Sequence, residues 1–332
     1  MKSYRLGFGP MSNEIIDILC EYSILYDLPL MIIASRNQVD WDGGYVCYTS
    51  ELAKRIKKHN ANILICRDHC GPYFSEKDKG LEIDTAIERC KNTIKTDILS
   101  GFDLIHIDVS RIPNNQLFYA EQLIDYCLSL NPDIRLEFGS EDNTGTNILD
   151  SINRIDGQLK FLEKYKKNVI FFVTQTGSYV KDQQLGRFDV ENNKQIVNKI
   201  HSYGLLIKEH NADYLTIGDL SLRLEAGVDS LNIAPQLGRI QTDLLTELCQ
   251  DNTIYQDFAN HVYDTNNWSR WVSQSTPSKE LAVSVSGHYC FNSPYYEKII
   301  ENIGLDKFRS NLKNKLFDVL DVYRFFNNGK TQ

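Results

Sequence analysis

Eight short apolar runs alternate with amphipathic stretches over residues 1–250 of this chain. The runs are rich in Ile, Val, Leu and Phe and have the length of strands, while the stretches between them carry apolar residues at helical spacing. Strands that alternate with helices form parallel βαβ units, and about eight such units close a (β/α)8 barrel. An open doubly wound sheet is the alternative, but the chain has no GxGxxG turn to support it. We expect strands at Arg5–Gly9, Leu30–Ser35, Ile63–His69, Leu104–Ser110, Ile134–Gly139, Val169–Gln175, Leu205–His210 and Ser230–Ala234, and helices at Asn13–Tyr26, Ser50–His59, Ile83–Ser100, Asn115–Leu130, Ile148–Lys166, Asn192–Tyr203, Ile217–Ala226 and Gln236–Gln250.

The last part of the chain, residues 251–332, has a different character. It is aromatic, with Trp268 and Trp271, and its pattern is mostly helical. No Pro-, Gly- or Ser-rich linker separates it from the preceding residues, so it is expected to be a helical extension packed on the barrel rather than a separate domain.

Composition narrows the function. The net charge is −8 and there is no basic block, which argues against a nucleic-acid partner. No apolar run is long enough to cross a bilayer, so no membrane association is expected. The eight cysteines form no CxxC pair and lie mostly in apolar runs, which is typical of reduced thiols in a cytoplasmic protein. A cytoplasmic protein that binds neither nucleic acid nor a membrane fits these features.

Polar side chains gather where the apolar strands end. The sharpest case is Asp68-His69, which ends an apolar run and is followed by Gly71-Pro72. Because all strand ends of a barrel meet at one mouth, these groups are expected to converge there. Two imidazoles with one or two oxygen donors would suit catalytic zinc, and manganese would accept the same mixed set. The candidate metal ligands are His69, His210, Gln175 and Glu137, and the candidate proton carriers are Asp68 and Glu141. His106 is as well explained by a core role as by substrate contact.

Several motifs, in order from about residue 30 to 240, resemble those of the Z-type subunits of class II tagatose-bisphosphate aldolases. The matching segments are Ile33–Tyr45 (A-T-x-N-Q-V-N-x-x-G-G-Y in the family), Asp68–Pro72 (D-H-L-G-P), Gly101–Ser110 (G-F-x-K-I-H-L-D-x-S), Gly139–Glu141 (G-T-E), Gln175 (Q-P-G) and Glu209–Tyr214 (E-x-H-S-T-D-Y). The resemblance implies a zinc-dependent barrel in which Asp68 transfers a proton while His69 and His210 bind the metal. Gln175 stands where catalytic class II aldolases have a further zinc-binding His, as it does in Z-type subunits.

This resemblance leaves two functions open. One is a metal-dependent enzyme that acts on a ketose or sugar phosphate by retro-aldol chemistry, with either C–C cleavage or 4-epimerisation as the outcome. The other is a non-catalytic subunit that stabilises a separate aldolase chain, and assembly as a homo-oligomer or with such a chain is expected. For the enzyme, the expected substrate-binding residues are Asn37, Gln38, Arg67, Asp108 and Asn232.

The chain also departs from the family where phosphate would bind. Asn211-Ala-Asp213 replaces the Gly-Ser phosphate loop, and a carboxylate would repel a phosphate. Asn232 stands in place of the family's Lys, and Gly287–Phe291 lacks the Arg of the R-Y-Y-W motif. The cations that would partly compensate are Arg36, Arg67 and Arg111. A divergent member with a substrate of its own is therefore expected.

Overall fold

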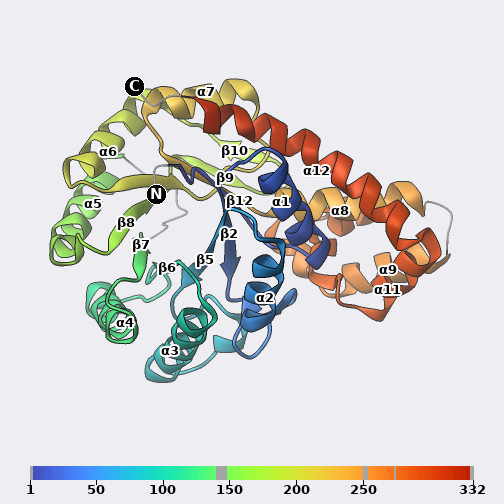
Figure 1. Cartoon of the computed structure of the whole chain (residues 1–332), viewed down its shortest axis with the longest axis horizontal. Helices are drawn as coiled ribbons and strands as arrows, with labels where there is room; N and C mark the ends of the chain where they lie inside the picture. Colours follow the sequence, from blue (N-terminus) through green and yellow to red (C-terminus); the bar gives the residue numbers. More distant parts are fainter. Residues whose placement is uncertain (1–2, 140–147, 250–252, 273, 330–332) are drawn as a thin grey trace.

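The computed structural model describes residues 3–139, 148–249, 253–272 and 274–329, with the side chains of residues 148–151 left aside. Its centre is a closed barrel of parallel strands in the order β1-β12-β11-β8-β7-β6-β5-β2 (Figure 1). These strands are β1 (Leu6–Phe8), β2 (Leu30–Ser35), β5 (Ile63–Cys70), β6 (Leu104–Ile107), β7 (Arg135–Phe138), β8 (Val169–Thr174), β11 (Leu206–Glu209) and β12 (Ser230–Ile233). The predicted (β/α)8 barrel is confirmed.

Helices surround the barrel as the periodicity predicted. They are α1 (Asn13–Leu25), α2 (Thr49–His59), α3 (Ile83–Ser100), α4 (Gln116–Leu130), α5 (Ile148–Leu162), α6 (Val190–Ser202), α7 (Ile217–Ala226) and α8 (Pro235–Leu248). The loops at the mouth contain two small two-stranded sheets. One pairs β3 (Val39–Asp40) with β4 (Cys47–Tyr48), and the other pairs β9 (Ser178–Val180) with β10 (Gln184–Gly186). These four were not predicted, because two- and three-residue strands leave no periodic signal.

Alternate residues of each strand face opposite sides of the barrel wall. Leu30, Ile32 and Ala34 belong to the large cluster between strands and helices, whereas Met31 and Ile33 belong to a small cluster with Cys66, Leu104 and Phe171. The small cluster fills the barrel interior with apolar side chains. Polar residues that share its parity therefore lie further along the same interior, toward the mouth.

The C-terminal part is helical, as predicted, and packs on one side of the barrel. It contains α9 (Thr253–Asp264), α10 (Lys279–Ser286), α11 (Pro294–Ile303) and α12 (Leu305–Asn328). Figure 1 shows α9 and α11 grouped beyond α8, while the long α12 runs back along α8 toward α7. The boundary near residue 250 that separates barrel from extension remains a prediction.

Two further findings bear on the composition arguments. All eight cysteines are free and buried, in keeping with the prediction that they form no disulfide framework. None of the helices in the described part of the chain has the length and apolar character needed to cross a membrane.

Candidate active site

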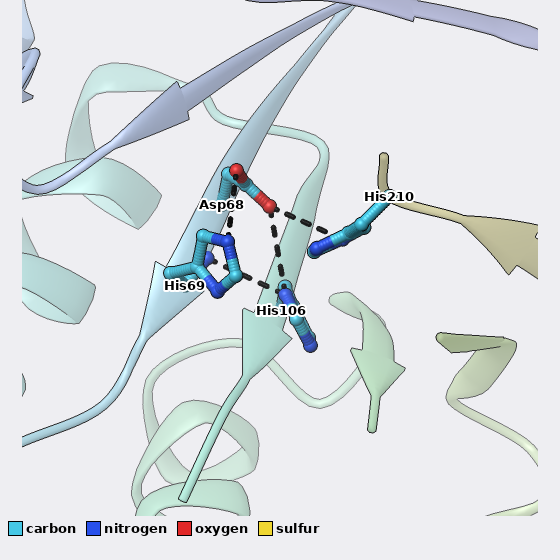
Figure 2. Close-up of side chains that lie close together, drawn as sticks. All are labelled: Asp68, His69, His106 and His210. Carbon is cyan, nitrogen blue, oxygen red and sulfur yellow. Dashed lines mark hydrogen bonds and ion pairs between the residues drawn. The ribbon is translucent and has the colours of Figure 1, made fainter. Parts of the chain in front are cut away.

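Four side chains converge at the barrel mouth. Asp68 and His69 come from the end of β5, His106 from β6, and His210 directly follows β11; one donor atom from each lies within 4.8 Å of the others. Figure 2 shows the three imidazoles and the carboxylate pointing toward one another across the interior. Within the described residues, this is the group of His and acidic side chains whose spacing suits a metal ion.

A β-bulge explains how two consecutive residues reach the same site. In a regular strand Asp68 and His69 would face opposite sides of the wall. Here the pairing of β5 with β6 shifts register between Arg67 and Cys70, and His69 adopts a left-handed backbone with φ of 47°. Left-handed backbone is costly for a residue other than glycine, and such strain often accompanies functional sites. The bulge turns the His69 ring into the mouth beside Asp68.

His106 also belongs to the site, although its sequence context fitted a core role as well as substrate contact. It is fully buried, and its Nδ1 lies 3.6 Å from Asp68 Oδ1. Its Nε2 has no hydrogen-bond partner among the described residues. The sequence contained a signal for this position. His106 lies two residues after Leu104, so both side chains face the barrel interior. A polar residue at an inward position near a strand end belongs to the mouth.

Asp68 is the electrostatic centre of the group. Its carboxylate oxygens lie 3.4 Å from His210 Nε2 and 3.7 Å from His69 Nε2. Burial acts to raise the pKa of Asp68, but the charges of the three surrounding imidazoles lower it well below its usual range. The carboxylate is therefore ionised at neutral pH and able to accept a proton or bind a cation.

Asp108 holds His69. Its Oδ2 lies 2.7 Å from His69 Nδ1, and its Oδ1 accepts a hydrogen bond from the Ser110 backbone. The Phe74 ring stacks on one face of the His69 imidazole, with a distance of 4.8 Å between the ring centroids. Each oxygen of the buried Asp108 thus has a partner in the protein, and substrate binding by Asp108 stays a prediction.

Arg67 is engaged by a carboxylate of its own. Its side chain has the outward parity of β5, is completely buried, and forms two 2.7 Å bonds to the Asp97 carboxylate. It also donates to the carbonyl oxygens of Ala34 and Val39. Arg36 is buried in the same layer with Asp78 and Asp40. Both cations are thus paired with buried carboxylates, and a role of Arg67 in substrate binding stays a prediction.

Glu137 lies inside the barrel but outside the metal cluster. Its carboxylate is paired with Lys208, and both side chains are buried. Lys208 Nζ also lies 4.5 Å from the centroid of the Phe171 ring. The pairing with Lys208 compensates the buried charge of Glu137, and its role as a metal ligand stays a prediction.

Asn37 and Gln38 shape the loops of the mouth. Asn37 donates to the Phe74 carbonyl and accepts from the Glu76 backbone. Gln38 accepts from the Ser35 backbone, and its Nε2 lies 3.5 Å from the Met11 sulfur. Both amide groups thus have partners in the protein, and their contact with substrate hydroxyls stays a prediction.

Three other predicted residues have different outcomes. Asn232 lies on β12 with 2% exposure, and neither atom of its amide has a partner among the described residues, so it stays a candidate for substrate contact. Gln175 follows Thr174, which pairs with Glu209, so Gln175 and His210 come next along neighbouring strands. Glu141 lies outside the described residues.

The donor set matches a divalent cation. Three imidazole nitrogens and one carboxylate oxygen form an N/O set typical of zinc, and other divalent ions accept it as well. The second nitrogen of His69 is bonded to Asp108, the arrangement by which metal-binding imidazoles are usually oriented. The residues present thus fit a metal.

With this geometry established, comparison with known proteins identifies relatives. Residues 11–125 match the model of a family described as D-tagatose-1,6-bisphosphate aldolase subunit GatZ/KbaZ-like. Over these residues the chain is similar to the GatZ/KbaZ-like family. A curated relative, the D-tagatose-1,6-bisphosphate aldolase subunit GatZ of Escherichia coli (strain UMN026), is 30% identical over 89 residues. That match covers 24% of this chain and 20% of the relative, so it spans only a fifth of the relative's length.

Solved structures support the fold over almost the whole chain. A probable tagatose 6 phosphate kinase from Sinorhizobium meliloti 1021 superposes with a TM-score of 0.75 at 18% identity, covering 90% of this chain and 86% of its own. A fructose-bisphosphate aldolase from Campylobacter jejuni gives a TM-score of 0.61 at 13% identity, covering 98% and 91%. At these identities the comparison shows a shared barrel, and the GatZ/KbaZ-like relationship rests on the sequence match.

Proposed function

We propose that this GatZ/KbaZ-like chain is a metal-dependent enzyme that breaks or remakes a C–C bond of a ketose by aldol-type chemistry. The observation that carries the proposal is the convergence of Asp68, His69, His106 and His210 on one point of the barrel mouth. In a (β/α)8 barrel, this end of the strands is where catalytic groups lie. The similarity to a fold that includes an aldolase agrees with this reading.

The metal would be held by His69, His106 and His210, with zinc as the first choice and manganese as the second. A divalent ion bound there supplies Lewis-acid polarisation of a substrate carbonyl. The protein's own contribution is to fix the three rings and to keep Asp68 ionised beside them. Gln175, at the end of the strand next to His210, stays a proposed further oxygen ligand.

Asp68 would be the group that moves a proton. As an ionised carboxylate, it accepts the proton of the substrate hydroxyl next to the bond that breaks. The bonding electron pair stays on the carbon next to the carbonyl. A second acid–base group returns a proton to that carbon if the aldehyde leaves, and Glu141 is proposed for that role. If the aldehyde turns and recombines, the product is the 4-epimer.

Metal binding is the first test. We expect the purified chain to bind about one Zn²⁺ or Mn²⁺ in calorimetry, because four donors already face one point. His106→Ala should weaken binding by at least about 100-fold, since changes to residues that only orient ligands already cost 10- to 100-fold. His59→Gln is the matched control, because His59 lies 2.8 Å from Asp17 at the surface. Unchanged affinity in His106→Ala would remove His106 from the ligand set.

Turnover is the second test. Incubation of the metal-loaded chain with D-fructose, D-tagatose and their phosphates should give a triose product for cleavage, or the C4 epimer for epimerisation. Asp68→Asn should lower the rate by about 100-fold or more, the usual contribution of a positioned acid–base group. A rate that survives this change would exclude Asp68 as the proton carrier.

A second candidate function rests on the curated relative, which is named as an aldolase subunit. On that reading, this chain stabilises a separate class II aldolase chain. Co-expression should then give a stable complex whose activity is the same with Asp68→Asn as with the unaltered chain. Loss of activity with Asp68→Asn would instead show that this chain carries out the reaction.

A further inference from the structure

The N-terminus of α8 is the place in this barrel where a phosphate would be expected. In (β/α)8 enzymes, phosphate groups frequently bind to the loops after the last two strands and to a neighbouring helix N-terminus. Free backbone N–H groups and the positive end of the helix dipole attract the anion there. In this chain the corresponding elements are the loop after β11 and the first turn of α8, which begins two residues after β12.

Asp213 already occupies that N-terminus. Its Oδ1 accepts hydrogen bonds from the backbone N–H of Ala234 at 3.0 Å and of Gln236 at 2.8 Å. Pro235 has no N–H to offer, and the N–H of Leu237 donates to the Ala234 carbonyl. The first-turn amides are therefore all accounted for, and the group that fills the position is a carboxylate with 1% exposure.

A buried histidine packs on the same turn from the C-terminal extension. A Cβ added to Gly238 would lie 2.7 Å from His288 Cβ, so the two residues are in direct contact. His288 is 1% exposed, and neither ring nitrogen has a partner among the described residues. Burial, and then the charge of Arg270, lower the pKa of His288 to about 3. This ring is thus neutral and offers one donor and one acceptor rather than a charge.

The cations nearby are engaged elsewhere. Arg270 is paired with Glu76 at 3.0 Å. Arg239 donates to Ser284 and to the Asp182 carbonyl. The groups around the first turn of α8 thus include the Asp213 carboxyl group, a neutral imidazole and the Asn232 amide, which has no partner among the described residues. Such a surface suits hydroxyl groups and disfavours a phosphate dianion.

We propose that the substrate of this chain is an unphosphorylated ketose, and that Asp213 determines this choice by filling the phosphate position at the α8 N-terminus. The proposal rests on the function proposed above, since it names the substrate class of that same site. Asn232 would bind a hydroxyl of the sugar end that lies against α8. Asp213 acts by exclusion and is not a catalytic residue.

Binding of D-tagatose and of D-tagatose 6-phosphate, measured by calorimetry on the metal-loaded chain, tests the proposal. The unaltered chain should bind the free ketose more tightly than the phosphate. Asp213→Ala removes the carboxylate and frees two N–H groups, so the ratio of phosphate affinity to ketose affinity should rise by about tenfold or more, which corresponds to 1.4 kcal/mol. Asp213→Asn is the matched control, because its side-chain oxygen can still accept from both amides and should leave the position closed.

Each result decides the matter. Tighter binding of the phosphate by the unaltered chain, or the same ratio in Asp213→Ala, overturns the proposal. If Asp213→Ala does not fold, the preference of the unaltered chain decides alone. The readout is binding and not turnover, so it stands even if no ketose is converted. A failure of the proposed function would appear separately, as absent turnover with the metal site loaded.

Discussion

Two contacts fix the His69 ring, one at its edge and one on its face. Its Nδ1 is bonded to Asp108 at 2.7 Å, and Phe74 stacks on its face with an interplanar angle of 10°. Nδ1 is held by a carboxylate, and Nε2 is the nitrogen that lies toward Asp68. The ring orientation that metal binding would need is therefore set by the protein itself.

Asp108→Asn tests this built-in orientation. The amide cannot accept the Nδ1 proton as strongly, so metal affinity should fall by about 10- to 100-fold while the fold is kept. Calorimetric titration with Zn²⁺ measures the loss, and circular dichroism checks the fold. Asp103→Asn is the control, because Asp103 accepts from the Ile65 backbone just before β6 starts, away from the site. Equal affinity in both variants would contradict the role given to Asp108.

Asp213 gives stability a pH dependence of defined sign. Burial raises its pKa from 3.8 to about 7, although hydrogen bonds from backbone N–H groups, chiefly those of Gln236 and Ala234, act to lower it. The folded chain therefore holds this proton more tightly than the unfolded chain, and the free energy of unfolding falls as pH rises from about 4 to 7. In Asp213→Asn the side chain does not titrate, so this fall in the free energy of unfolding is absent. In urea unfolding, the variant should gain about 1–3 kcal/mol relative to the unaltered chain between pH 5 and pH 8. The prediction would be contradicted if the difference in the free energy of unfolding between the variant and the unaltered chain were the same at pH 5 and pH 8.

At the scale of elements, the end of β5 has a geometry that depends on glycine. A Cβ at Gly71 would lie 1.5 Å from the backbone oxygen of Asp108, a separation that no side chain permits. The chain after the bulge therefore presses against the residue that holds His69. This close approach couples the Asp68-His69 pair on one strand to Asp108 after the next.

Gly71→Ala should therefore damage the site through the backbone. The methyl group must push Asp108 away, which should lower the free energy of unfolding by about 1–3 kcal/mol and weaken metal binding. Chemical unfolding and calorimetric titration measure the two effects. Gly157→Ala is the control: Gly157 is on α5 with nothing within 4 Å of an added Cβ, so the change should be neutral or stabilising. A Gly71→Ala chain that still binds metal normally would show that the contact relaxes easily.

How much of this could be predicted depends on the kind of information each feature needs. Strand and helix positions follow from local periodicity, so the barrel and its mouth were predicted correctly. The surroundings of Arg67 and His106 were not predicted, because the side of the wall that each faces depends on strand parity: Arg67 faces Asp97 outside, and His106 faces Asp68 inside. The bulge at His69 depends on pairing with β6, a non-local property that no local pattern encodes.

At the scale of the whole molecule, α12 contacts both the start of β1 and the loop that follows β11. The Arg5 guanidinium, next to β1, donates to the carbonyl oxygens of Phe326 and Gly329. The buried Tyr323 hydroxyl donates to the Ala212 carbonyl at 2.6 Å and accepts from the Leu215 backbone at 3.3 Å. The loop that follows His210 is thus held by a helix from the far end of the sequence. No motif predicted this support.

Tyr323→Phe tests whether the extension supports the site. The change keeps the packing of the ring but leaves the Ala212 carbonyl and the Leu215 N–H without this partner, which should lower the free energy of unfolding by about 1–3 kcal/mol. Because Ala212 lies two residues after His210 and one before Asp213, metal affinity and the preference for free ketose should weaken together. Urea unfolding and the two titrations described above measure these effects. Tyr295→Phe is the control, since that side chain is 36% exposed on α11 and should change neither quantity. A Tyr323→Phe chain that is destabilised but keeps both affinities would confine α12 to a purely structural role.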